Sequence, residues 1–154
     1  KRMHFNVNIP NNLIVRVDED RIKQVLINLL TNAIKFAPED SEILIFAYPE
    51  KEYAVVEVWD DGPGVPPSDH ERVFEKFYKN DNKEGAGLGL AICKGIIEAH
   101  NGIIGVNSDG QNGSCFYFKL PYPDRNRESF SNESVHSTEQ HRLLEIARRI
   151  TAPC

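Results

Sequence analysis

The sequence predicts an α+β fold, a two-layer sandwich in which helices pack on one face of a mixed, mostly antiparallel sheet. Segments rich in β-branched and aromatic residues occur as two adjacent pairs, 43–48 with 53–60 and 103–107 with 114–120. Apolar residues recur at helical spacing over residues 19–36. Hairpins and helices that occur in blocks, without strict alternation, are typical of α+β folds.

The amino-terminal part predicts a hairpin followed by the long helix. Residues 5–9 and 13–17 flank a Pro-Asn-Asn turn and are expected to be two short paired strands. Carboxylates at residues 18–20 favour the start of the helix over 19–36. One face of this helix is apolar and must cover the sheet; its residues are Ile22, Val25, Leu26, Leu29, Leu30 and Ala33.

Two helices are predicted between the strand pairs. The first is short and lies around residues 69–77. The second is longer, spans residues 88–100 and ends at Asn101-Gly102, a pair that favours the left-handed backbone of a helix end. His100 at this end is interpreted as a structural cap.

Composition limits the functional class. The chain has 154 residues, 40% hydrophobic and 27% charged, which is typical of one globular domain with a core. A net charge of -5 without basic clusters argues against a nucleic-acid partner. Apolar runs fall short of the roughly 18 residues that cross a bilayer. The three cysteines show no paired spacing, which indicates reduced thiols in the cytoplasm. We see no targeting segment and expect the chain to start within a longer protein.

A domain boundary is predicted near residue 123. All of the net charge lies in residues 1–123, because residues 124–154 hold equal numbers of acidic and basic side chains. A polar, linker-like stretch follows the boundary. Ser137-Thr-Glu-Gln140 then resembles a capping box ahead of an apolar pattern, which predicts one short amphipathic helix within residues 137–150.

A polar stripe accompanies the apolar face of the first long helix. Asn28, Asn32 and Lys35 are spaced i, i+4, i+7 and therefore share one side. Amide oxygens can complete the octahedral shell of Mg²⁺, and a lysine adds positive charge for phosphates. The stripe is consistent with a metal–polyphosphate site; taken alone, it is more simply a solvated polar flank of the helix.

Two glycine-containing segments are further candidates. Asp60 ends a predicted strand before Asp61-Gly62-Pro63-Gly64, where a carboxylate could accept the amine of adenine; an ordinary turn is the alternative. Residues 85–90 run into the predicted helix at 88 and could form an anion cradle, without the spacing of a Rossmann or P-loop motif. Between these segments, residues 66–84 are expected to form a hinged lid with an aromatic anchor at Phe74 and Phe77.

Together these segments resemble the ATP-binding domain of sensor histidine kinases. That domain belongs to an ATPase superfamily shared with type II topoisomerases, mismatch-repair proteins and a heat-shock chaperone. Residues 28–36 resemble the N box, 60–64 the G1 box, 74–77 the F box and 85–90 the G2 box. The match covers residues 1–121 and implies a Bergerat-type fold with ATP and Mg²⁺ as cofactors.

The resemblance also implies individual roles. Asn32 would be the metal ligand, with Asn28 and Lys35 supporting the phosphates as further catalytic residues. Asp60 would read the adenine amine. The other implied cofactor-binding residues are Phe36 against the base, Gly62 and Gly64 at the pocket floor, Gly85, Gly87, Leu88 and Gly89 over the phosphates, and Lys79 towards the γ-phosphate, with Lys76 or Lys83 as alternatives.

The implied reaction is transfer of the γ-phosphoryl group of ATP to a histidine. Hydrolases of the superfamily carry Glu one helical turn before the metal-binding Asn, where this chain has Asn28, so we expect slow attack by water. The chain's histidines lack the setting of a phosphoacceptor. The acceptor is therefore expected on a separate dimerisation domain, within a homodimer that could be membrane-anchored and would pass the phosphoryl group to a response regulator receiver.

Two alternatives share the motifs. A serine kinase of the anti-sigma-factor type has the N, G1 and G2 elements but lacks the pair formed by Phe74 and Phe77. A non-catalytic nucleotide-sensing module would be expected to have lost Asn32, Asp60 or the glycines, all of which are present.

Overall fold

The structure is a computed structural model that describes residues 1–78 and 87–123. Lys79, Gly85 and the predicted carboxyl-terminal helix lie outside the described residues. The boundary near residue 123 stays a prediction.

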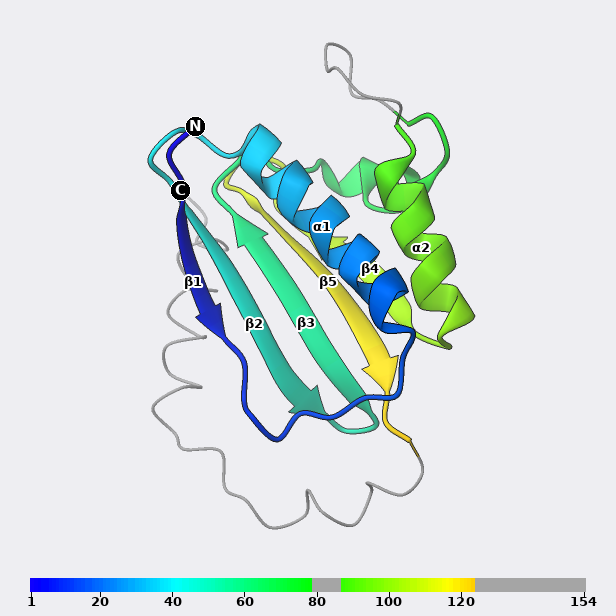
Figure 1. The fold of residues 1–154 in the computed structure, drawn as a ribbon. Helices are drawn as coiled ribbons and strands as arrows, with labels where there is room; N and C mark the ends of the chain where they lie inside the picture. Colours follow the sequence, from blue (N-terminus) through cyan, green and yellow to red (C-terminus); the bar gives the residue numbers. More distant parts are fainter. Residues whose placement is uncertain (79–86, 124–154) are drawn as a thin grey trace.

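A five-stranded mixed sheet forms one layer of the molecule (Figure 1). Its spatial order is β1-β2-β3-β5-β4. β1 pairs in parallel with β2, and the other three pairs are antiparallel. The strands are β1 (His4–Asn8), β2 (Glu42–Glu50), β3 (Tyr53–Asp60), β4 (Ile103–Asn107) and β5 (Ser114–Pro121).

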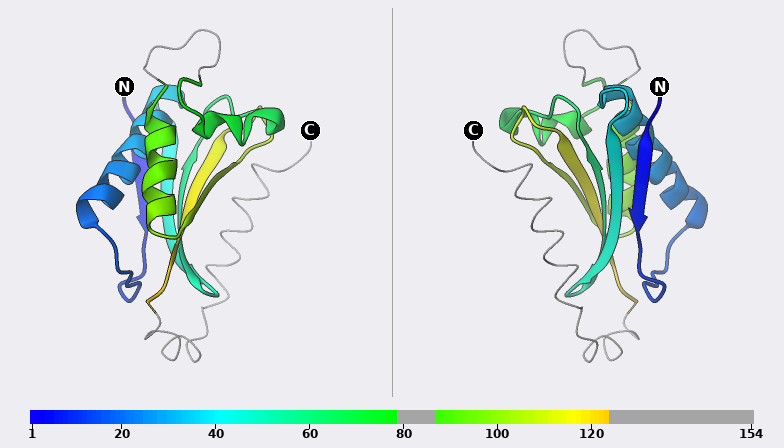
Figure 2. Two further views of the ribbon diagram at one scale, coloured as in Figure 1. Left: turned by 90° about the vertical axis from the view of Figure 1, so that its right-hand side faces the viewer. Right: turned by 90° about the vertical axis from the view of Figure 1, so that its left-hand side faces the viewer.

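Two helices cover one face of this sheet, α1 (Glu19–Phe36) and α2 (Gly89–Ala99) (Figure 2). The Asp18 side chain caps α1 by accepting a hydrogen bond from the backbone N–H of Arg21. The core lies between the layers and includes Val25, Leu29, Ile43, Val58, Cys93, Ile97 and Phe118, all of which are at most 1% exposed. The predicted two-layer α+β sandwich is therefore confirmed.

The amino-terminal hairpin prediction is wrong. β1 pairs with β2, so the strand partner of residues 4–8 comes from residues 42–46 and not from 13–17. The Pro10 turn is present, with Leu13 N–H donating to the Pro10 carbonyl at 3.4 Å, but the following residues form no strand. Val15 and Val17 instead pack against the core, which accounts for the alternation that resembles a strand.

The short helix predicted around residues 69–77 is also wrong. Two 3-10 turns occupy this region, η1 (Pro67–Asp69) and η2 (Arg72–Phe74). Glu75 has an extended backbone with ψ 150°, and Phe77 has a positive φ of 64°. Neither conformation is compatible with a continuous helix.

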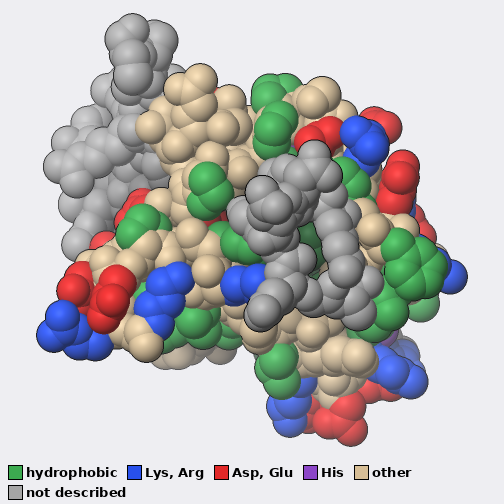
Figure 3. All heavy atoms as spheres, turned by 90° about the horizontal axis from the view of Figure 1, so that it is seen from above, with side chains coloured by type: hydrophobic (Ala, Val, Ile, Leu, Met, Phe, Trp, Pro, Cys, Tyr) green, Lys and Arg blue, Asp and Glu red, His purple; other side chains and the backbone are tan. Residues whose placement is uncertain are grey.

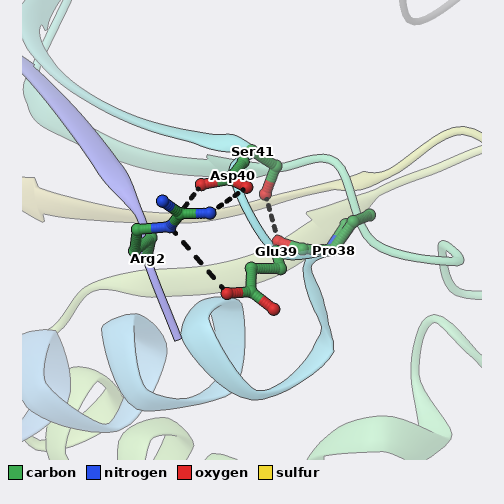
Figure 4. A network of polar contacts seen from close by, with 5 residues as sticks. All are labelled: Arg2, Pro38, Glu39, Asp40 and Ser41. Carbon is green, nitrogen blue, oxygen red and sulfur yellow. Dashed lines mark hydrogen bonds and ion pairs between the residues drawn. The ribbon is translucent and has the colours of Figure 1, made fainter.

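The N-terminal segment is fixed to the connection between α1 and β2 (Figure 4). Arg2 Nε lies 3.0 Å from Asp40 Oδ1, and the Ser41 hydroxyl donates to the Pro38 carbonyl at 2.8 Å. Lys1 Nζ donates to the carbonyls of Ile34 and Lys35 at 2.8 and 3.1 Å. These contacts hold the carboxyl end of α1, where the predicted site begins.

Within the described residues, no helix combines the length and apolar character needed to cross a membrane.

Candidate nucleotide-binding site

The predicted motif segments meet at one end of the sandwich. The end of α1, the end of β3 and the start of α2 all lie there (Figure 1). Figure 3 looks onto this end, where basic side chains stand beside uncharged polar and backbone surface. The fold thus brings together segments that are far apart in the sequence.

Asp60 is a buried carboxylate at the end of β3, only 5% exposed. Its Oδ1 accepts a hydrogen bond from the backbone N–H of Gly62 at 2.8 Å, and the Ser114 hydroxyl also bonds to it. Burial raises the pKa of Asp60 to about 6, the neighbouring Asp61 charge raises it further, and the two hydrogen bonds oppose the shift. A perturbed carboxylate of this kind is typical of functional sites.

Gly62 joins the Asp60 turn to the end of α1. A Cβ placed on Gly62 would lie 2.5 Å from Asp60 Oδ1 and 3.3 Å from the backbone C and O of Phe36. Only a residue without a side chain fits between the carboxylate and the helix end. Gly64 has φ +80°, and a Cβ there would lie 2.8 Å from Ser108 Oγ. Gly62 therefore lies close to both the Asp60 carboxylate and the backbone of Phe36.

Asn28 links α1 to the start of α2. Its Nδ2 donates to the carbonyl of Gly89, the first residue of α2, at 3.2 Å. Asn32, one turn further along α1, is half-buried. Lys35 is exposed, and its Nζ lies 5.3 Å from the centroid of the Phe36 ring. The polar stripe therefore runs from the α2 junction to the end of α1.

The predicted aromatic anchor is only half correct. Phe74 is 7% exposed and packs edge to face against Phe116, with 6.3 Å between ring centroids. Phe77 is 70% exposed, so it does not pack into the core. Phe77 instead makes a backbone contact with the G2 segment, because its N–H donates to the Gly87 carbonyl at 2.9 Å. Tyr78, whose hydroxyl donates to Asp69 Oδ2 at 2.8 Å, follows directly.

Gly87 and Leu88 lie between this backbone contact and α2. Gly87 has φ +66°, and a Cβ there would lie 2.8 Å from the Tyr78 carbonyl oxygen. Leu88 is the residue that precedes the first turn of α2. The backbone of the G2 segment thus leads directly into the positive end of a helix dipole, the arrangement that favours bound phosphate.

The sequence reasoning missed two residues that support Asp60. Ser114 stands opposite Asp60 in the β3–β5 register and is 4% exposed. Gly113 precedes it, and a Cβ there would lie 2.2 Å from the Asp60 carbonyl oxygen. Residues 113–116 also resemble the closing segment of the family, but only the strand pairing shows that Gly113 and Ser114 lie against Asp60.

His100 forms a second link between the helices. Its Nδ1 lies 2.8 Å from the Ile96 carbonyl, and its Nε2 accepts from the backbone N–H of Asp18 at 3.1 Å. His100 is also the C-cap residue of α2, as the structural interpretation predicts. The two helices are therefore joined at Asn28 near the site and at His100 at the far end.

Comparison with known proteins identifies the class. The model of the family described as "Histidine kinase-, DNA gyrase B-, and HSP90-like ATPase" matches residues 17–124. The chain belongs to this family, and its relatives identify it as an ATP-binding catalytic domain of the sensor histidine kinase type.

Two curated relatives illustrate the match. The sensor protein KdpD of Escherichia coli is 43% identical over 122 residues, which covers 76% of this chain and 14% of KdpD. The adaptive-response sensory kinase SasA of Thermosynechococcus vestitus is 44% identical over 126 residues, covering 79% of this chain and 33% of SasA. The chain thus spans a third or less of these two relatives.

Solved structures agree in fold. The catalytic domain of the histidine kinase ThkA has a TM-score of 0.70 at 38% identity, covering 79% of this chain and 82% of that one. Full-length ShkA in complex with AMPPNP has a TM-score of 0.70 at 34% identity, covering 78% and 26%. ThkA in complex with the response regulator TrrA has a TM-score of 0.66 at 35% identity, covering 81% and 36%.

Proposed function

We propose that this domain binds magnesium–ATP at the end of the sandwich described above and donates the γ-phosphoryl group to a histidine on a separate dimerisation domain. The observation that carries the proposal is that the described parts of the four motif segments meet at one end of the sandwich, where the Asp60 carboxylate is buried. Binding of AMPPNP by the related ShkA supports the choice of an adenine nucleotide.

The residues supply complementary contacts for such a nucleotide. Ionised Asp60 accepts a hydrogen bond from the adenine amine, and the glycine turn beside it lets the flat base approach. Phe36, at the end of α1, lies against the base. Gly87, Leu88 and Gly89 present the backbone at the start of α2 to the phosphates.

The polar stripe of α1 fits a magnesium ion in its chemistry. The described residues contain no group of three or more His, Cys, Asp or Glu side chains that could hold a metal ion. Asn32 instead offers a neutral, hard amide oxygen, and Lys35 offers a cation for the phosphates. Bound Mg²⁺ would neutralise part of the phosphate charge. Asn28, whose Nδ2 donates to Gly89, fixes the position of α2 beside this stripe.

The reaction places few chemical demands on the domain. An imidazole nitrogen of the acceptor attacks the γ-phosphorus, the bond to the bridging oxygen of ADP breaks, and the imidazole proton passes to solvent. Asn28 cannot act as a general base towards water at neutral pH, so hydrolysis is slow. His70 and His100 make structural contacts, with the Val65 carbonyl and with both helices respectively, which supports an acceptor on another domain.

The partners follow from the same relatives. The complex of ThkA with TrrA supports a response regulator receiver as the next acceptor. We further propose that the full-length protein is a homodimer and that this domain works in the cytoplasm.

The test is phosphotransfer in a protein that contains this chain and its histidine-bearing domain, with ATP labelled at the γ-position. Asn32→Ala removes the proposed metal ligand and is expected to abolish labelling of the histidine. Thr31→Ala is the matched control, because Thr31 is exposed on the same helix and its hydroxyl bonds only locally, to the Ile27 carbonyl at 2.6 Å.

Two results would contradict the proposal. Full labelling in the Asn32 variant would exclude its role at the metal. Labelling of a serine on an added partner protein, with none on histidine, would assign the chain to the anti-sigma-factor type of serine kinase instead.

A further inference from the structure

The first residue of the chain lies against the carboxyl end of α1. The carbonyl groups in the last turn of a helix have no partner within the helix. Lys1 supplies two of the missing hydrogen bonds, because its Nζ donates to the carbonyls of Ile34 at 2.8 Å and of Lys35 at 3.1 Å. Its positive charge also complements the negative end of the helix dipole. Lys1 therefore stabilises the last turn of α1.

Arg2 holds Lys1 in this position (Figure 4). Its Nη2 donates to Asp40 Oδ2 at 3.1 Å, and its Nε lies 3.0 Å from Asp40 Oδ1. The two backbones are joined as well, because Asp40 N–H donates to the Arg2 carbonyl at 3.0 Å. Asp40 has a positive φ of 60°, which is uncommon for a residue other than glycine. Side-chain and backbone contacts together fix the start of the chain to the connection that follows α1.

The end of α1 in turn lies close to the turn that holds Asp60. A Cβ on Gly62 would lie 3.3 Å from the backbone C and O of Phe36 and 2.5 Å from Asp60 Oδ1. The Gly62 N–H donates to the same Asp60 oxygen at 2.8 Å. Because too little room remains for even a methyl group, the position of the helix end limits where this turn and its carboxylate can lie.

These contacts form a path from the Lys1 ammonium group to the Asp60 carboxylate. Each step is a hydrogen bond or a close backbone approach within α1, its cap or the turn after β3. The path ends where the base of the nucleotide is proposed to bind, since Phe36 and Asp60 are the residues assigned to adenine. A cation that belongs to none of the motif segments is thus connected to base recognition.

We propose that Lys1 is a positioning residue of the nucleotide site. Its charge holds the last turn of α1, and through Phe36 and Gly62 this turn sets the place of the Asp60 carboxylate. The inference rests on the proposed function, because the site that Lys1 serves is the proposed adenine pocket. Lys1 acts without touching the nucleotide, so the loss of its charge weakens ATP and ADP binding by the same factor.

Calorimetric titration of the 154-residue chain with ATP and with ADP, each with Mg²⁺, tests this inference. Lys1→Met removes the ammonium group and keeps an unbranched side chain of similar length. It is expected to weaken both nucleotides about two- to fivefold, the range for one charge at a helix end. Lys1→Arg keeps the charge and is expected to restore the affinity. Lys23→Met is the matched control, because it removes one lysine from the other half of α1, where Lys23 pairs only with exposed Glu19 at 2.6 Å, and it is expected to change neither affinity.

Hydrogen exchange measured by NMR follows the path without nucleotide. The Ala37 N–H caps α1 with a bond of 2.9 Å and reports opening of its last turn, while the Gly62 N–H reports opening of the turn after β3. Both amides are expected to exchange about two- to fivefold faster in Lys1→Met than in the unsubstituted chain. Lys23→Met is expected to leave both rates unchanged.

The outcomes separate this inference from the proposed function. Unchanged affinity in Lys1→Met, an equal loss in Lys1→Met and Lys1→Arg, or unchanged exchange at Gly62 would overturn the inference. A larger loss for ATP than for ADP would also overturn it, because the charge would then act on the phosphates directly. If the unsubstituted chain binds neither nucleotide, the proposed function fails, whereas exchange at Ala37 and Gly62 still tests the path.

Discussion

Asp60→Asn is expected to make the nucleotide-free domain more stable at neutral pH. The carboxylate is 5% exposed, and its pKa is raised from 3.8 to about 6. A difference of about two pH units between the folded and unfolded states corresponds to about 3 kcal/mol by which ionised Asp60 destabilises the fold. Asparagine has the same shape, and its carbonyl oxygen can still accept the Gly62 N–H, so the variant avoids this penalty.

The effect of Asp60→Asn on the free energy of unfolding is expected to depend on pH. Because the pKa of Asp60 is higher in the folded state, the folded protein binds the proton more tightly. The penalty is therefore absent below pH 3.8, grows between 3.8 and about 6, and is complete above that value. Urea unfolding of both proteins without nucleotide is measured at pH ~7 and near pH ~4. The variant is expected to be about 2–3 kcal/mol more stable at the higher pH only. A less stable variant at pH ~7, or a difference that is equal at both pH values, would refute the reasoning.

Two further predictions concern contacts around the helices. Gly62→Ala forces a methyl group to within 2.5 Å of Asp60 Oδ1 and is expected to cost about 1–3 kcal/mol of unfolding free energy; Gly95→Ala, within α2 and with nothing within 4 Å, is expected to add about 0.5–1 kcal/mol. An equal loss in both would argue against the close packing of the turn. His100→Leu removes the links to Ile96 and Asp18 and is expected to cost about 1–3 kcal/mol in urea unfolding. His100→Gln, which can restore an acceptor near Nε2, is expected to recover part of this loss, and no difference between the two would mean that the link to Asp18 contributes nothing.

Most of the fold could be predicted because local patterns and tertiary packing agree. The apolar stripe of α1 and the alternation in β2, β3 and β5 each bury one face of an element, and the structure uses them as expected. The first strand was paired wrongly because a turn at Pro10 is compatible with a hairpin, whereas the choice of β2 as the partner depends on a contact across more than thirty residues. The helix predicted around η2 was wrong for a similar reason. A tertiary contact between buried Phe74 and Phe116 holds this region in place, and no α-helix is needed for it.

The site residues could be predicted from motif order, and their physical state could not. The sequence places Asp60 at a strand end, but only the structure shows that its carboxylate is buried and held by Gly62 and Ser114. The roles assigned to Asn32 and Lys35 stay predictions, because they depend on a bound nucleotide. Lys79 and Gly85 lie outside the described residues, so their assignments are likewise untested.

The central claim is that Asp60 recognises adenine within a magnesium–nucleotide site. Calorimetric titration of this chain with ATP and with GTP, each with Mg²⁺, tests it most directly when repeated with Asp60→Asn. The account predicts ATP binding that exceeds GTP binding, and a loss of about 1–3 kcal/mol in ATP binding free energy in the variant. Equal affinity for both nucleotides, or unchanged ATP affinity in the variant, would contradict it.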